Sequence, residues 1–543
     1  MSRVLLTGLA LVLAACSGGG GDDASKDQPG GSSGNGPGPG PTPDPAAVCG
    51  ESKLGTPKLR RLTRGELTST LNDVFPGVSG WTSVLSADPI SKHGFDNDAA
   101  LLVVGKQTAD ELDRTADAVG AAVSGAALQS LLPCSATTKD AACAAEFIGK
   151  YGKRLFRRAL SAEESGRYAA LFQQVASAKD FATGIRFVTR ALVQSPYAVY
   201  RSEIGAAQGG ARRLAPHEVA AALAYNFSGT APSEALLARA EAGELSSPAA
   251  REAVARELLL SDKGLPIVER FFNLWLGYGH ASSVTKPNVQ QFDALRSQMV
   301  GETQRFLGEV VITQNGGLKE LLTAPFTTPS ASLAQFYGFP APSADYAVTA
   351  RPAGRGVGIL AQGALLATLS GPAASSPTKR GLLVMERLLC RTKPTVPADV
   401  PDLKPPEPGL TTRQRYEESH ASGSCKACHQ HFDPIGFGFE HFDEAGRYRE
   451  NENGLPINAA SYVPGNGGHL FDFASLEELA HGLAAEEAPY ECASGFMSTY
   501  VFGGTESCLG ETKRPAFVGQ QLGFVDYFAS LAAEPHFVER RAQ

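Results

Sequence analysis

Residues 424–449 read SCKACHQHFDPIGFGFEHFDEAGRYR, and this stretch contains two cysteines followed closely by a histidine. Cys425, Cys428 and His429 form a C-x-x-C-H motif, which is typical of covalent c-type haem attachment. Two thiols one short turn apart can each bond to a vinyl group of one porphyrin, and the adjacent histidine is then held against the iron. The motif therefore predicts one haem c, attached through both cysteines, with His429 as the proximal iron ligand.

Two other uses of this cysteine pair have to be compared with haem attachment. A zinc site needs two further ligands at suitable spacing, and only His431 and His441 lie near, with no second cysteine pair. A redox-active C-x-x-C usually begins a helix in a thioredoxin-like βαβ unit, and that pattern is missing. Haem attachment is therefore the preferred interpretation.

The ligand on the far side of the haem is left open by the sequence. Met497 is the first candidate, because a methionine downstream of the attachment motif is the usual arrangement in small c-type cytochromes. His420, His469 and His481 are alternatives. An open position would change the expected role from electron carrier to catalyst.

Charged residues follow the motif closely. Glu440, Asp443 and Arg447 could clamp the haem propionates or form an ion network within a turn. A salt-bridged turn is the preferred interpretation, because exposed charges at such spacing usually pair with each other.

The N-terminus carries an export pattern. MSRVLLTGLALVLAAC has one early arginine and an apolar run that is too short to span a bilayer, so residues 1–15 are expected to be a signal peptide. Residues 13–16, LAAC, resemble a bacterial lipobox, which implies cleavage before Cys16 and lipidation of its thiol. Ser17 then indicates outer-membrane sorting. Residues 16–48, rich in Gly, Ser and Pro, cannot bury enough apolar surface to fold and are expected to be a disordered tether.

Lipidation and haem attachment would use three of the nine cysteines. An even remainder of six in an exported protein favours three disulfides. Cys134–Cys143 and Cys492–Cys508 are expected because the two cysteines of each pair are close in sequence. Cys49–Cys390 is expected only because these two cysteines are then left over.

The rest of the chain has mainly helical patterns. Thr63 with Glu66 and Ser161 with Glu164 form capping boxes, and Pro216 begins a third helix. Apolar residues recur at helical spacing in two further segments and are expected to form core: Ile267, Phe271, Leu274 and Trp275, then Leu295, Met299, Phe306 and Val310.

The expected fold class is mainly α, as a multi-domain helical body with a cytochrome c-like haem segment towards the C-terminal third. A buried helix is expected at 381–390, and strand-like runs occur only near 344–349 and 461–471. The expected domains follow one another along the chain: 49–125, 126–204, 205–345, the haem-binding domain 346–465 and a C-terminal helical domain 466–543.

Several segments resemble one family of large, exported, cytochrome c-like bacterial proteins built of successive domains of unknown function. The resemblance covers nearly the whole body after residue 55, and Phe432 stands where many relatives carry methionine. The segments occur in family order: RRLTRGELTSTLNDVF, FRRALSAEE, SPYAVYRSE, RFFNLWLG, GRGVGILAQGALLATLSGPAASSPTKRG, the haem segment and EPHFVERR. The resemblance implies a mainly helical chain with one haem c in the periplasm or at the cell surface, and it supplies no substrate.

The expected function is extracytoplasmic electron transfer by a lipid-anchored protein with a redox partner protein. The chain has 543 residues and a formal net charge of −7 without a concentrated basic patch, which argues against nucleic acid as a partner. Two alternatives remain: a surface or polysaccharide-binding lipoprotein with structural haem, and a peroxidase- or oxygenase-like haem enzyme with an open iron position. An electron carrier or oxidoreductase component is preferred to a hydrolase, because hydrolase motifs are missing.

Overall fold

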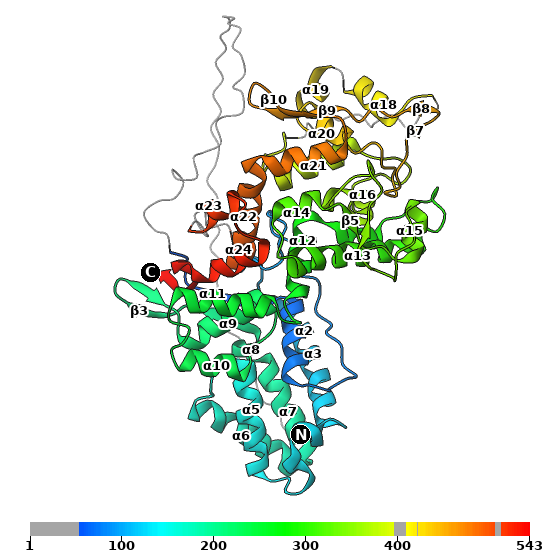
Figure 1. Ribbon diagram of the computed structural model, residues 1–543. Coiled ribbons are helices and arrows are strands. Elements are labelled where there is room, and N and C mark those ends of the chain that lie inside the picture. Colours follow the sequence, from blue (N-terminus) through cyan, green and yellow to red (C-terminus); the bar gives the residue numbers. More distant parts are fainter. Residues whose placement is uncertain (1–53, 396–408, 421, 505–511, 543) are drawn as a thin grey trace, which may run out of the picture. The chain divides into compact units, whose positions relative to one another are not determined.

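The computed structural model of this protein is dominated by helices (Figure 1). It describes residues 54–395, 409–420, 422–504 and 512–542. Within these ranges the strands form only two- and three-stranded sheets. The mainly helical class predicted from the sequence is confirmed.

Several predictions fall on residues outside the described ranges. These are the signal peptide at 1–15, the tether at 16–48 with its lipidated Cys16, and the cysteines Cys49 and Cys508. In the part of the chain that the structure describes, no helix combines the length and apolar character needed to cross a bilayer.

Helices begin where the capping patterns predict. The Thr63 hydroxyl accepts a hydrogen bond from the Glu66 backbone N–H at 3.2 Å, and the Glu66 carboxylate accepts one from the Thr63 N–H at 2.8 Å. Ser161 and Glu164 make the same exchange, and Pro216 occupies the first turn of its helix. The three helices that begin in this way are α2 (Arg64–Val74), α6 (Ala162–Ala178) and α9 (Pro216–Ser228).

The N-terminal helices enclose one apolar cluster, which we call the N-terminal core. Phe147 and Val188 lie at its centre and are fully buried. The predicted disulfide Cys134–Cys143 is confirmed and ties the turn at Pro133–Ala136 to the following helix. Around this core lie α2, α6 and three further helices: α3 (Lys106–Ser124), α5 (Ala141–Phe156) and α7 (Phe181–Gln194).

The second and larger cluster, which we call the main core, contains the two predicted apolar stripes. Trp275 on α12 (Leu265–Leu276) and Met299 on α13 (Phe292–Leu307) are buried in it, so their prediction as core residues is confirmed. Phe95 and residues from Leu214 to Val538 contribute to this cluster. The neighbouring helices are α10 (Glu234–Glu241), α11 (Pro248–Leu259), α14 (Leu318–Thr323), α15 (Ala331–Tyr337), α16 (Gly363–Thr368), α21 (Leu476–Ala485), α22 (Glu487–Phe502), α23 (Arg514–Val518) and α24 (Phe524–Ser530).

The helix expected at 381–390 has different bounds. It begins earlier, as α17 (Pro377–Leu383), and continues as a wider π-helical segment, η5 (Val384–Leu388). Cys390 follows directly and is bonded to Cys492 of α22. The expected pairs Cys492–Cys508 and Cys49–Cys390 are therefore wrong. Because α22 packs against η5, the two Cα atoms lie 5.4 Å apart although 102 positions separate them in sequence.

Short strands complete the fold. The strand-like run near 461–471 forms an antiparallel hairpin of β9 (Ser461–Gly465) and β10 (Gly468–Phe473), whereas the run near 344–349 contributes only to β6 (Thr349–Ala350). The C-terminal β11 (Glu539–Arg541) pairs with β4 (Ala211–Arg213). The other short elements are β1 (Lys58–Arg61), α4 (Leu128–Leu131), α8 (Pro196–Val199), β2 (Tyr200–Glu203), β3 (Ala206–Gln208), β5 (Phe326–Thr327), β7 (Asn451–Glu452), β8 (Leu455–Pro456) and α25 (Pro535–Val538).

Candidate functional site

The C-x-x-C-H motif forms the short helix α19 (Gly423–His429). Cys425 and Cys428 lie three positions apart on it, so their thiols share one face of the helix. Both thiols are free and partly exposed. Among the described residues, every other cysteine is in a disulfide, so this pair is the one available for covalent chemistry in that part of the chain.

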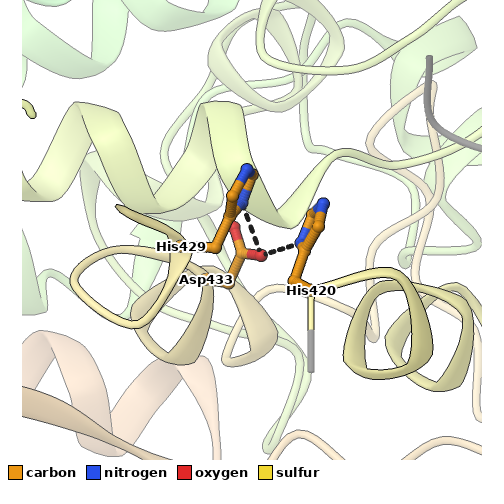
Figure 2. Close-up of side chains that lie close together, drawn as sticks. All are labelled: His420, His429 and Asp433. Carbon is orange, nitrogen blue, oxygen red and sulfur yellow. Dashed lines mark hydrogen bonds and ion pairs between the residues drawn. The ribbon is translucent and has the colours of Figure 1, made fainter. Parts of the chain in front are cut away.

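His429 is held through one ring nitrogen by Asp433, the first residue of α20 (Asp433–Phe437). The distance from His429 Nδ1 to Asp433 Oδ2 is 2.9 Å (Figure 2). The four-residue spacing puts both side chains on the same side of the turn between the two helices. A carboxylate can only accept, so Nδ1 donates the hydrogen bond and the lone pair of Nε2 is left as a metal ligand.

The second oxygen of the Asp433 carboxylate is also hydrogen-bonded. Thr378 on α17 donates a hydrogen bond from Oγ1 to Asp433 Oδ1 at 2.7 Å, and the same hydroxyl lies 3.4 Å from His429 Nδ1. Asp433 is buried, which by itself would raise its pKa. Hydrogen bonds from His420, His429 and Thr378 outweigh burial and hold the pKa of Asp433 below its ordinary value, so the group is a carboxylate at neutral pH.

His420 follows α18 (Thr412–Ser419) and shares the same carboxylate oxygen. Its Nδ1 lies 2.6 Å from Asp433 Oδ2, and its ring stacks on that of His429 with 3.5 Å between the ring centroids. Figure 2 shows the remaining nitrogens of both rings pointing the same way, away from Asp433. Two ligands on opposite faces of a haem must point towards each other, so this arrangement does not place His420 opposite His429.

The other candidates for the far side of the haem lie on separate elements. Met497 is fully buried on α22 within the main core. His469 on β10 stacks on Tyr462, and His481 is exposed on α21. The His429 ring instead contacts His420, Asp433, Thr378 and Phe432. The assignment of Met497 as distal ligand stays a prediction.

The charged residues after the motif are bonded within the protein. Asp443 accepts hydrogen bonds from Arg447 through both the backbone N–H and the side chain. Glu440 is fully buried, accepts a hydrogen bond from Ser375 at 2.8 Å, and lies 3.7 Å from the guanidinium of Arg380. Burial raises the pKa of Glu440 despite the neighbouring arginines. The preferred interpretation of Glu440, Asp443 and Arg447 as a salt-bridged turn accords with these contacts.

Arg380 of α17 holds this turn in place. Its guanidinium is completely buried and donates to the backbone oxygens of Phe439, Phe442 and Asp443. A buried cation is costly unless it is hydrogen-bonded, and these bonds tie the turn to α17.

Two glycines let α17 and α20 come into backbone contact beneath the motif. A Cβ atom at Gly381 would lie 1.9 Å from the backbone oxygen of Phe432, and one at Gly436 would lie 1.9 Å from that of Pro377. Any side chain at either position would push the helices apart. This close approach brings Thr378 within reach of Asp433.

The sequence pointed to Cys425, Cys428 and His429 but not to the supporting roles of Asp433 and Thr378. The spacing His429-x-x-x-Asp433 was the available signal, because residues four apart at a helical turn face each other. Thr378 lies in a distant segment, and no local pattern relates it to the motif.

Four family models match the chain in succession, and each is described as a protein of unknown function. They are PSD3 (DUF1587) at residues 60–125, PSD5 (DUF1595) at 143–203, PSD4 (DUF1592) at 214–339 and PSCyt3 (DUF1588) at 356–452. The chain thus contains successive domains of unknown function, as the sequence resemblance implied, and the C-x-x-C-H motif lies in the last matched segment. No curated protein and no solved structure matches the chain.

Proposed function

We propose that this protein is a lipid-anchored, single-haem c-type cytochrome that transfers electrons outside the inner membrane. Cys425 and Cys428 would bind the porphyrin, and Nε2 of His429 would bind the iron. The observation that carries the proposal is the combination of two free thiols on one helix face with an imidazole whose other nitrogen is already bonded to Asp433. The name of the matching model, PSCyt3, suggests a cytochrome-like family and agrees with this reading.

The residues around the motif fit a haem in chemical character. Cys428 packs against the main core, and the ring of Phe432 lies 5.0 Å from that of His429, so apolar groups adjoin the polar ligand set. The haem, when bound, supplies reversible one-electron chemistry. Asp433 orients the His429 ring and fixes its tautomer, while Thr378 keeps the carboxylate in place.

The location in the cell is proposed from the sequence. An export signal at residues 1–15, a lipidated Cys16 and a flexible tether would hold the helical body at the outer membrane. Disulfide bonds agree with an oxidising compartment, because such bonds are rare in the cytoplasm. One haem favours single-electron exchange with an unidentified redox partner protein.

The proposal is tested by producing the full chain together with haem-attachment machinery. The wild-type protein should keep haem covalently after denaturation, and the double variant Cys425→Ser/Cys428→Ser should lose it. The matched control Cys134→Ser/Cys143→Ser removes a cysteine pair away from the motif and should retain haem. Covalent haem in the Cys425→Ser/Cys428→Ser variant, or its absence from the wild type, would contradict the proposal.

A second candidate function is favoured by the Asp433–His429 pair. A carboxylate hydrogen-bonded to the proximal imidazole raises its basicity, which suits a haem enzyme with an open iron position as well as a carrier. Carbon monoxide distinguishes the two, because it binds an open ferrous iron. A reduced spectrum unchanged by carbon monoxide supports the carrier, and a shifted one supports the enzyme.

A further inference from the structure

An open groove with a volume of about 710 Å³ lies along α2, and it shares no residue with the C-x-x-C-H site. One wall is a single stripe of that helix, since its lining residues recur at helical spacing from Arg64 to Asn72. The other wall is the loop from Trp81 to Ile90, with Asp96 and Arg270 beyond it. Nothing in the proposed electron transfer requires this groove.

Trp81 gives the groove an aromatic surface. The side chain is partly buried, packs against the N-terminal core and also lines the groove, so the core supports the ring from one side. The other tryptophan of the chain, Trp275, is by contrast 1% exposed inside the main core. The electron-rich face of an exposed indole is a surface on which the C–H groups of a sugar ring pack well.

The helix wall offers uncommitted polar groups. Thr68, Ser69 and Asn72 line the groove, and none of their side chains has a hydrogen-bond partner among the described residues. Hydroxyl and amide groups both donate and accept hydrogen bonds. Gly65, in the same stripe, adds no side chain and leaves room above the helix backbone.

The two carboxylates of the groove are already neutralised. Asp88 accepts hydrogen bonds at 2.6 Å from the Arg61 side chain and from the Arg64 backbone N–H. Asp96 accepts one from Arg270, also at 2.6 Å. The lining therefore presents two paired carboxylates, the guanidinium of the exposed Arg64, and side chains that both donate and accept hydrogen bonds. The last group matches a ligand whose own groups both donate and accept.

We propose that this groove binds a short stretch of a neutral oligosaccharide, with one sugar ring on Trp81 and hydroxyl groups bonded to Thr68, Ser69 and Asn72. A protein partner fits the observations less well, although Ile90 at the groove is 57% exposed, because most of the lining residues are polar or charged. The binding would not require haem. It would give the helical body a role in holding glycan, separate from the proposed redox site.

The test is isothermal titration of the full-length protein in detergent with cellohexaose, xylohexaose, maltohexaose and laminarihexaose, and with trigalacturonate as an acidic probe. We expect at least one neutral probe to bind. Trp81→Ala should weaken that binding at least tenfold, and Asn72→Ala should weaken it several-fold. Asn72 is an exposed helix position where alanine is well tolerated, so this second variant guards against a folding defect at Trp81.

Phe187→Ala is the matched control, because Phe187 is an aromatic residue of α7 that is 40% exposed and does not line the groove. It should bind like the wild type, and so should Cys425→Ser/Cys428→Ser, which separates this inference from the haem proposal. The inference is overturned if no neutral probe binds, if only trigalacturonate binds, or if Trp81→Ala and Phe187→Ala bind alike.

Discussion

His429 and Asp433 are joined by a hydrogen bond of 2.9 Å between Nδ1 and a buried carboxylate oxygen, one turn after the C-x-x-C-H motif. The contact fixes the orientation of the imidazole before any iron is bound. It also makes the ring a stronger electron donor, because the carboxylate draws the Nδ1 proton towards itself. A stronger donor stabilises ferric iron, so this contact would lower the reduction potential of the proposed haem, whereas ligation by methionine would raise it.

Asp433→Asn should raise the potential of the proposed haem. The amide oxygen can still accept the hydrogen bond, but the negative charge that favours ferric iron is gone. A tenfold change in the ferric-to-ferrous equilibrium corresponds to about 59 mV for a one-electron couple, and we expect an upward shift of that order. Redox titration followed by absorbance measures it.

Asp472→Asn is the control for that measurement. Asp472 also pairs with a histidine, His469, at 2.7 Å, but on an exposed hairpin. Its removal should leave the potential unchanged. An equal shift in both variants would mean that general charge, rather than the bond to His429, determines the potential.

His420→Phe should change the potential in the opposite direction. His420 competes with His429 for the same oxygen of Asp433, and a phenylalanine could still stack on the neighbouring ring without donating a hydrogen bond. The full charge of the carboxylate would then act on His429, so the potential should fall. Haem attachment should persist, and the spectrum should be low-spin in both the wild type and the variant if the carrier proposal holds. Loss of the low-spin spectrum would instead identify His420 as an iron ligand.

The sequence predicts a structural feature well when that feature depends on residues close together in the chain. The motif residues and the caps at Thr63 and Ser161 depend on spacings of a few residues, and the sequence predicted the caps correctly. The bond between Cys390 and Cys492 depends on how α22 packs against η5, which no local pattern encodes, and proximity along the chain gave the wrong partners. Thr378 reaches Asp433 for the same kind of reason, through the close approach of α17 and α20.

The disulfide Cys390–Cys492 should stabilise the protein more than Cys134–Cys143. Its ends are 102 positions apart and enclose the C-x-x-C-H segment, whereas the other pair is 9 positions apart. Loop-closure entropy predicts a loss of about 5 kcal/mol for Cys390→Ala/Cys492→Ala and roughly 2 to 3 kcal/mol for Cys134→Ala/Cys143→Ala. Urea unfolding of both variants at one pH makes the comparison. A smaller loss for Cys390→Ala/Cys492→Ala would show that the longer loop is already restricted in the unfolded chain.

Glu164 should make the free energy of unfolding of the N-terminal helices decrease at low pH. Its carboxylate accepts two hydrogen bonds at 2.8 Å from Arg158. The hydrogen bonds from Arg158 lower its pKa most strongly, burial opposes them, and the Ser161 N–H adds to the lowering, so that the pKa falls from 4.5 to about 2. A lowered pKa means that the folded state favours the charged form.

The stabilisation by Glu164 should therefore be fully present above pH 4.5 and should be lost as the pH falls towards 2. Glu164→Gln keeps an acceptor for the Ser161 N–H but loses the ion pair, so we expect a loss of roughly 1 kcal/mol at pH 6. At pH 3 the difference from the wild type should be smaller. The Glu164 carboxylate of the unfolded wild-type chain is then largely protonated, which lowers the free energy of the unfolded state and so reduces the stabilisation that the ion pair provides. Urea unfolding at both pH values measures it, with Glu163→Gln, an exposed neighbour paired to Arg167, as the control that should show little change. An undiminished difference at pH 3 would attribute the effect of Glu164 to packing rather than charge.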